Sequence, residues 1–90
     1  MDNGSLIRKN PQVVYRSLAD EGGVLLHLES GQYHGLNEMG RLIWGLLDED
    51  TTLESLVADL REHLLDPPDD LSREVERFLT DLRERDLLAP

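Results

Sequence analysis

The 90-residue sequence predicts an α+β domain, in which a three-stranded antiparallel β-meander precedes three helices in a winged helix-turn-helix-like arrangement. Two apolar runs flank Ser30-Gly31, a dipeptide suited to a hairpin turn because glycine accepts a positive φ. Three later segments carry apolar residues at helical spacing, and Pro67-Pro68 separates the last two because proline interrupts a helix. One sheet face and three apolar helix faces can therefore enclose a single small core.

We expect the chain to begin with a flexible arm over residues 1–11, followed by one domain over residues 12–90. The arm mixes polar and charged residues and ends at Asn10-Pro11, a dipeptide typical of turns. Residues 12–18 are rich in β-branched and aromatic residues, and a glycine-containing turn follows at residues 20–23. This composition predicts the first strand.

The hairpin supplies the second and third strands and leaves residues 32–36 at an edge of the sheet. A loop of two or four residues around Ser30-Gly31 sets the register between the two strands. The expected cross-strand pairs are Leu28 with Tyr33 and Leu26 with Gly35 on one face, and His27 with His34 and Leu25 with Leu36 on the other.

Each of the three helices has a start signal and an apolar stripe. Asn37 is a good N-cap for the first helix, and Thr51 with Glu54 fits a capping box for the second. The third helix begins at Asp69 or Asp70, directly after the two prolines. The three stripes are Met39, Leu42, Ile43, Leu46 and Leu47; Leu53, Leu56, Val57, Leu60 and Leu64; and Leu71, Val75, Phe78, Leu79 and Leu82.

Composition narrows the range of partners. The chain carries 9 Lys and Arg against 19 Asp and Glu, and the net charge of −10 repels nucleic acid and anionic lipid surfaces. It has no Cys, which excludes disulfides and Cys nucleophiles and is typical of a reducing compartment. The sequence lacks a secretory signal, and no apolar run approaches the roughly 18 residues of a membrane span. We therefore expect a cytoplasmic protein with no nucleic-acid or membrane partner.

Few residues offer a route to catalysis or metal binding. His27 and His34 are expected to be cross-strand neighbours, but two imidazoles fall short of the three or four protein ligands that zinc uses. The acidic pairs Glu49-Asp50 and Asp69-Asp70 lie at helix starts, where carboxylates cap backbone N–H groups. The sequence contains no Gly-rich phosphate loop. We expect no catalytic residue, no metal and no cofactor.

Three further features favour structural interpretations over chemical ones. Trp44 lies on the flank of the first stripe, so we expect a partly buried aromatic residue rather than a ligand contact. Ser72 follows Asp70-Leu71, which is the motif of acyl and peptidyl carrier proteins in the wrong order, and carrier domains are helical bundles without a hairpin. A winged-helix DNA binder is the other alternative, but the third helix is too acidic for a recognition helix.

One motif resembles a known family. The spacing is Tyr-x-x-Leu-Asn-x-x-Gly-x-x-Ile-Trp over residues 33–44, followed by Leu47-Asp48, the Thr51-Thr52 helix start and Phe-Leu-x-x-Leu over residues 78–82. It resembles the PqqD-like family, the recognition elements for leader segments of ribosomally made, post-translationally modified peptides (RiPPs), along residues 12–88. Residues 24–33 resemble the stand-alone members of lasso-peptide clusters. Asp86 departs from the family, which commonly has Gly there, and Asp adopts the left-handed conformation less readily.

The resemblance implies a non-catalytic adaptor. Such a protein binds the leader of a precursor peptide, here that of a lasso peptide, and presents it to a separate leader peptidase and a cyclase. The alternative is a recognition or chaperone protein for another RiPP or PQQ-type pathway, acting with a radical SAM enzyme.

The edge strand supports peptide binding independently of the resemblance. Residues 32–36 contain no Lys, Pro or inward charge to blunt the edge, which favours docking of another strand. The resemblance implies that the peptide lies between the third strand and the third helix. One flank of that helix carries Glu74, Arg77, Phe78, Asp81, Leu82 and Arg85, and we favour it over the flank with Ser72, Glu76, Leu79 and Arg83. The predicted peptide-binding residues are Gln32, Tyr33, His34, Gly35, Leu36, Glu74, Val75, Arg77, Phe78, Asp81 and Leu82.

Overall fold

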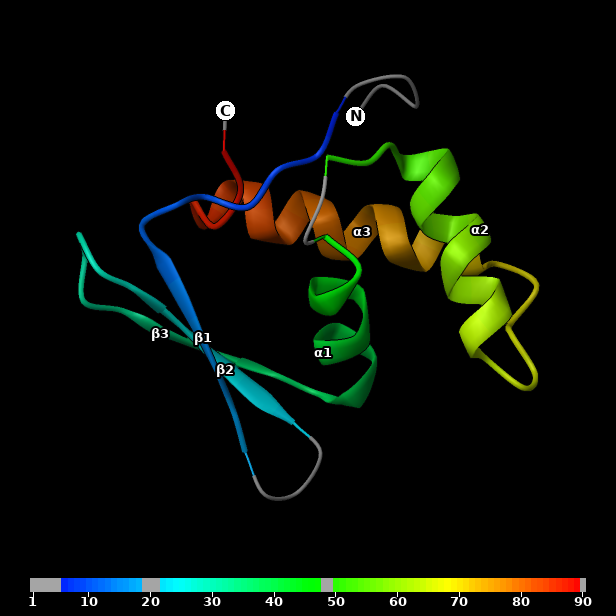
Figure 1. Cartoon of the computed structure of the whole chain (residues 1–90), viewed down its shortest axis with the longest axis horizontal. Coiled ribbons are helices and arrows are strands. Elements are labelled where there is room, and N and C mark those ends of the chain that lie inside the picture. The colour runs from blue at the N-terminus through cyan, green and yellow to red at the C-terminus, as the bar shows by residue number, and fades with distance from the viewer. Residues whose placement is uncertain (1–5, 19–21, 48–49, 90) are drawn as a thin grey trace.

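The computed structural model describes residues 6–18, 22–47 and 50–89, which form three antiparallel strands followed by three helices (Figure 1). The sheet has the order β1-β2-β3, so β3 lies at an edge. This confirms the predicted α+β fold class and the meander. The elements are β1 (Val13–Ser17), β2 (Gly23–His27), β3 (Tyr33–Leu36), α1 (Glu38–Gly45), α2 (Leu53–His63) and α3 (Leu71–Glu84).

The sheet and the helices enclose one core. Figure 1 shows the sheet at one end and α2 at the other, with α1 between them and α3 reaching from α2 towards the sheet. The predicted stripes of α2 and α3 are buried, apart from Leu64 and Phe78, which are partly buried. The buried apolar cluster comprises Ile7, Leu25, Leu36, Ile43, Trp44, Leu47, Leu53, Leu56, Val57, Leu60, Leu71, Val75, Leu79, Leu82, Leu87 and Leu88.

Helix α1 is rotated relative to its predicted stripe. Trp44 is 3% exposed, whereas Met39, Leu42 and Leu46 are only partly buried. Lys9 from the N-terminal segment covers the indole ring, with Nζ 4.9 Å from the ring centroid. The expectation that Trp44 lies on a partly buried flank is therefore wrong, because a segment distant in sequence covers that side of the helix.

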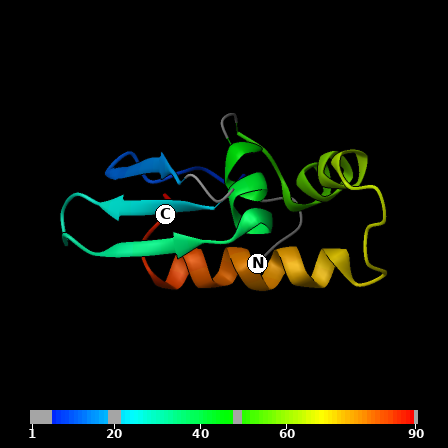
Figure 2. The same cartoon turned by 90° about the horizontal axis from the view of Figure 1, so that it is seen from below.

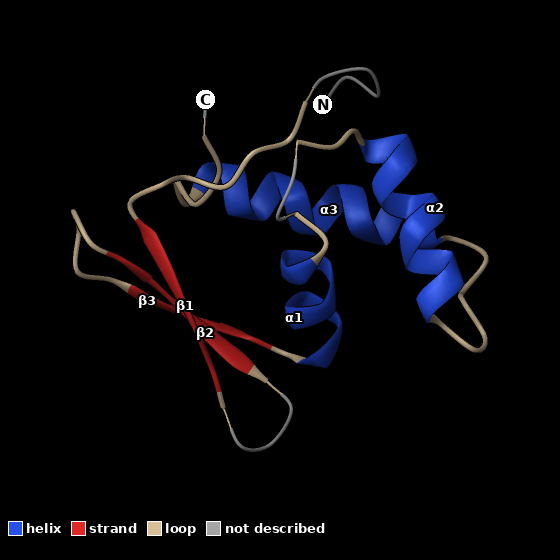
Figure 3. Cartoon of the chain, in the orientation of Figure 1, coloured by secondary structure: helices blue, strands red, loops and turns tan. Residues whose placement is uncertain are grey.

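Residues 7–10 were expected in a flexible arm, but they pack on the body of the protein. Ile7 is 2% exposed, and its N–H donates to the Thr51 carbonyl at 2.6 Å. Lys9 forms an isolated bridge with Leu88, and the Asn10 N–H donates to the Leu87 carbonyl at 3.1 Å. Figure 3 shows this segment crossing the C-terminal end of α3. Residues 1–5 of the expected arm lie outside the described residues.

The hairpin register differs from the prediction by two residues. Leu26 pairs with Tyr33 and Leu25 with His34, and the His27 N–H donates to the Gln32 carbonyl at 3.0 Å. The loop is a four-residue turn over residues 28–31 because Gly31, with a φ of 74°, ends the turn and donates its N–H to His27. An even shift keeps each residue on its predicted face.

The helix caps agree with the prediction at two of the three starts. The Asn37 side chain accepts the Gly40 N–H at 2.7 Å, as expected for the α1 cap, and Asp70 is the N-cap residue of α3. The α2 cap is Thr52 rather than Thr51, because Thr51 bridges to Ile7 and the Ser55 N–H donates to Thr52 Oγ1 at 3.2 Å. The predicted motif residue Asp48, the acidic residue Glu49 and part of the turn at residues 20–23 lie outside the described residues.

Candidate functional site

A cavity of about 250 Å³ lies along the open edge of the sheet, and we call it the β3–α3 groove. Figure 2 shows β3 running alongside the C-terminal half of α3. Tyr33 is 69% exposed on the strand, whereas Phe78 is partly buried on the helix. The lining residues are Tyr33, His34, Gly35 and Leu36 from β3, Phe78, Asp81, Leu82 and Arg85 from α3 and its C-cap, and Leu87.

A smaller cavity of about 170 Å³ lies between α1 and the N-terminal half of α3, and we call it the α1–α3 cavity. Phe78 lines both cavities, so they are neighbours along α3. Gly40 leaves space for Phe78, since a Cβ built there would lie 3.3 Å from Phe78 Cε1. The lining residues are Asn37, Met39, Gly40, Ile43, Leu71, Glu74, Val75 and Phe78.

The structure places nearly all of the predicted binding residues at these two cavities. Two of them lie elsewhere. Gln32 precedes β3 and lines a neighbouring hollow with His27 and Ser30. Arg77 lies on the outer flank of α3 beside Arg73, because successive helical residues are about 100° apart and Phe78 faces the groove.

Sequence reasoning missed the contribution of α1. Gly40 and Ile43 line the α1–α3 cavity, yet no helical wheel of α3 could reveal which helix packs beside it. The signal available was Gly40 itself, since glycine inside a helical stripe marks a close approach of another element. Leu87 was also missed, because it lies beyond the end of α3.

Arg85 connects the two walls of the groove. Its Nε donates to Asp81 Oδ1 at 3.1 Å, and its Nη1 lies 3.3 Å from His34 Nδ1 on β3. The Arg85 and Asp81 side chains are about half exposed, so this ion pair contributes at most ~1 kcal/mol to stability. These polar groups form the exposed rim of the groove.

The end of α3 is set by Asp86. The Leu87 N–H donates to the Leu82 carbonyl at 2.9 Å and the Asp86 N–H to the Arg83 carbonyl at 3.1 Å, which is a Schellman motif. Asp86 has a φ of 62°, so it adopts the left-handed conformation despite its side chain. The Asn10 side chain donates to the Asp86 carbonyl at 2.8 Å. The motif directs Leu87 into the core at the end of the groove.

The two strand histidines are not cross-strand partners. His27 pairs with Val13 and His34 with Leu25, because the register differs from the predicted one. Among residues 6–18, 22–47 and 50–89, no three His, Cys, Asp or Glu side chains gather into a metal site. None of the helices in this part of the chain is long and apolar enough to cross a membrane.

The fold and the groove define a class of protein. It is a small winged-helix-like α+β domain with an open edge strand, and peptide-binding domains use such an edge to accept a partner strand. The sequence pattern of the PqqD family, described as coenzyme PQQ synthesis protein D, matches residues 22–88, and the chain belongs to this family. Domains of this family are non-catalytic peptide binders, so the protein is not an enzyme.

Two solved structures are similar to this chain. The first, of TbiB1 in complex with the TbiA(beta) leader peptide, has a TM-score of 0.78 and 32% identity, covering 90% of this chain and 93% of that one. The second, of lasso peptide synthetase B1 complexed with the leader peptide, has a TM-score of 0.78 and 26% identity, covering 96% of this chain and 100% of that one. No curated protein matches the chain.

Proposed function

We propose that this protein binds the leader segment of a ribosomally made precursor peptide, that of a lasso peptide, by adding it as a strand to β3. It then presents the leader to a separate leader peptidase and a cyclase. The two similar structures support this proposal because each holds a leader peptide. The observation that carries it is the β3–α3 groove, which borders an open strand edge.

The backbone of β3 indicates which groups a leader would use. The His27 N–H donates to the Gln32 carbonyl at 3.0 Å, so residue 32 directs its C=O towards β2. Pairing alternates along an antiparallel strand, so residues 34 and 36 do the same, and Tyr33 and Gly35 direct N–H and C=O outwards. These two residues are the expected donors and acceptors for the leader strand.

Side chains of the added strand would supply specificity. Alternate residues of a strand point to the same side, so every second leader side chain would face α3. Phe78 lies between the two cavities, with Glu74 lining one and Asp81 the other. We infer that an apolar leader residue enters the α1–α3 cavity and that polar residues meet the rim formed by Asp81 and Arg85.

A proline and an alanine at one position test strand addition. Gly35→Pro removes an outward N–H, whereas Gly35→Ala keeps it, and no heavy atom lies within 4 Å of a Cβ built at Gly35. We expect isothermal titration with the leader encoded in the same gene cluster to give at least a tenfold (~1.4 kcal/mol) weaker affinity for Gly35→Pro. Gly35→Ala should bind like the wild type. Normal leader binding by a folded Gly35→Pro variant would exclude strand addition at this edge.

Proline substitutions at residues 35 and 34 should affect the stability of the sheet differently. His34→Pro is no substitute, because the His34 N–H faces β2 and its loss weakens the sheet itself. We expect Gly35→Pro to melt near the wild-type temperature and His34→Pro to melt well below it. The reverse order would place the outward N–H at residue 34 instead.

The proposal also covers the biosynthetic pathway that the protein serves and its location in the cell. The PqqD family description favours the alternative, a PQQ-type pathway with a radical SAM enzyme, whereas the two similar structures favour a lasso-peptide pathway. Leader processing that requires an added peptidase would support the lasso reading, and processing only with an added radical SAM enzyme would support the alternative. We propose a cytoplasmic location, since the chain contains no Cys.

A further inference from the structure

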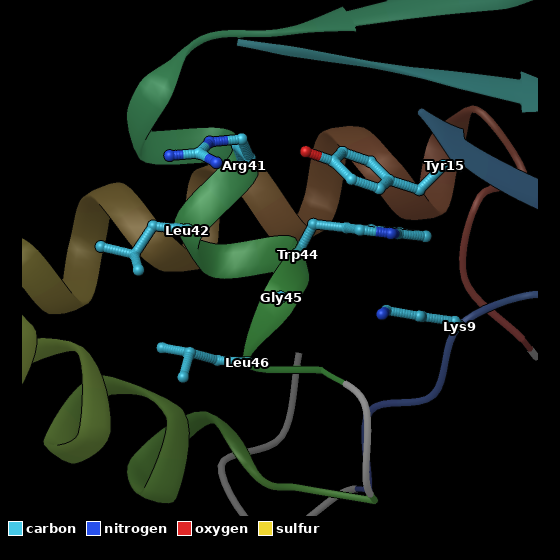
Figure 4. A pocket seen from close by; sticks show the side chains of 7 residues that line it. All are labelled: Lys9, Tyr15, Arg41, Leu42, Trp44, Gly45 and Leu46. Carbon is cyan, nitrogen blue, oxygen red and sulfur yellow. The ribbon is translucent and has the colours of Figure 1, made fainter. Parts of the chain in front are cut away.

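A larger cavity, of about 530 Å³, lies on the other side of α1 from the α1–α3 cavity, and we call it the α1–β1 pocket (Figure 4). Gly40 and Ile43 face the α1–α3 cavity, whereas Arg41 and Trp44 line this pocket. Of the described residues, none lines both this pocket and the β3–α3 groove. The lining residues are Lys9, Tyr15, Arg41, Leu42, Trp44, Gly45 and Leu46.

The pocket offers an apolar surface built around Trp44. Figure 4 shows the indole between the Tyr15 ring and the Lys9 ammonium, whose Nζ is 4.9 Å from the ring centroid. Leu42 and Leu46 are only partly buried and extend this surface along α1. A cavity of this size, with mainly aromatic and aliphatic walls, is typical of sites that take a large apolar group.

The charges of this pocket differ from those of the groove. Its charged lining residues in the described chain are Lys9 and Arg41, both cationic, in a protein of net charge −10. The β3–α3 groove carries Asp81 and Arg85, which pair with each other, and the α1–α3 cavity carries Glu74. The protein as a whole repels an acidic partner, whereas two cations beside an apolar surface attract such a partner locally. The α1–β1 pocket is therefore the place where an acidic segment would bind.

We propose that the α1–β1 pocket is a second protein-docking site, which binds an acidic segment of a partner protein that carries a large apolar side chain. The apolar side chain packs on Trp44 and Leu46, and flanking carboxylates pair with Lys9 and Arg41. Arginine suits this role because its planar guanidinium binds a carboxylate through two hydrogen bonds. The site goes beyond leader binding, and the two sites can be occupied together.

The chain's single tryptophan provides a direct readout. The probe is the peptide acetyl-Asp-Glu-Phe-Leu-Glu-Asp-amide, and the control is the same peptide with Lys and Arg in place of the acidic residues. We expect a saturable change in Trp44 emission, with affinity at least about tenfold tighter for the acidic peptide. Equal affinities, or no saturable change up to about 1 mM peptide, would overturn the proposal.

Charge-reversed variants separate the pocket from the overall charge. Arg41→Glu should lower the affinity for the acidic peptide by at least about tenfold. Arg61→Glu, at an exposed position on α2, changes the net charge equally and should leave the affinity within about twofold. An equal loss of affinity in both variants would show that only long-range repulsion acts, and would contradict the proposal.

Two further experiments test the role of Lys9, the second cation of the pocket, and the independence of leader binding. Lys9→Met keeps an aliphatic stem over Trp44 and removes the ammonium, so weaker binding of the acidic peptide by a variant that stays folded in circular dichroism supports pairing at Lys9. Unchanged peptide binding by Lys9→Met would remove Lys9 from the proposed site. Leader affinity of Arg41→Glu should equal that of the wild type, so failure of the docking proposal and failure of the leader proposal are distinguishable.

Discussion

Asp86 Oδ2 lies 3.1 Å from His27 Nε2, and this contact joins the end of α3 to the central strand of the sheet. His27 is 3% exposed. Its Nδ1 accepts the Ser30 N–H at 3.3 Å, so Nε2 carries the ring proton that faces the carboxylate. The side chain of Asp86 therefore supplies a partner to a buried imidazole, which Gly could not do. This interaction offsets part of the cost of a left-handed backbone at a non-glycine residue.

Substitutions of Asp86 separate these two effects. Asp86→Ala keeps the left-handed strain and leaves a buried N–H of His27 unpaired, so we expect a loss of ~1–3 kcal/mol in the free energy of unfolding. Asp86→Gly loses the same contact but removes the strain, so its loss should be smaller by ~1 kcal/mol. Urea unfolding followed by circular dichroism measures both. Wild-type stability of Asp86→Ala would show that the contact with His27 contributes nothing.

Gly40 and Gly45 form a matched pair on α1. A Cβ at Gly40 meets Phe78 Cε1, Leu36 Cδ2 and Asn37 Oδ1, each at 3.3 Å, whereas a Cβ built at Gly45 has no heavy atom within 4 Å. We expect Gly45→Ala to raise the free energy of unfolding by ~0.5–1 kcal/mol, because alanine favours helix. Gly40→Ala should raise the free energy of unfolding by less than Gly45→Ala does. It should also weaken leader binding, because Phe78 must move. Equal behaviour of the two variants, in thermal melts and leader titration, would argue against Phe78 as a wall of the groove.

Asp81 and Arg77 test which flank of α3 meets the leader. Asp81 lines both the β3–α3 groove and the hollow on the outer flank and pairs with Arg85 at 3.1 Å, whereas Arg77 lines the outer hollow and not the groove. Both residues are exposed, so Arg77→Glu should change stability by less than ~0.5 kcal/mol and Asp81→Lys, which breaks the pair with Arg85, by about 1 kcal/mol. We expect leader affinity to fall about tenfold for Asp81→Lys and to stay near wild type for Arg77→Glu. A larger loss for Arg77→Glu would place the leader on the outer flank.

Leu6 and Ile7 test the packing of the N-terminal segment. Ile7 is 2% exposed and Leu6 is 52% exposed. We expect Ile7→Ala to lower the free energy of unfolding by ~2–5 kcal/mol, since it opens a cavity in the core. Leu6→Ala should change it by less than ~0.5 kcal/mol. Chemical denaturation of the two variants measures the difference, and similar values would mean that this segment contributes little to the core.

The sequence by itself determined the features that depend on near neighbours. The order of the elements, the Asn37 cap and the apolar stripes of α2 and α3 follow from residues two to eight positions apart. The edge position of β3 also followed, because a meander of three strands leaves the last one unpaired on one side. Most residues of the groove could be predicted for this reason, since β3 and one face of α3 supply them.

Only the tertiary structure decided the features that depend on distant partners. The Asn10 side chain binds a carbonyl 76 residues away, and His27 meets a carboxylate 59 residues away. Such contacts draw residues 7–10 into the body, bury Trp44 beneath Lys9 and hold Asp86 in the left-handed conformation. The hairpin register belongs to the same group, because pairings that differ by two residues bury the same strand face and the turn conformation at Gly31 selects between them.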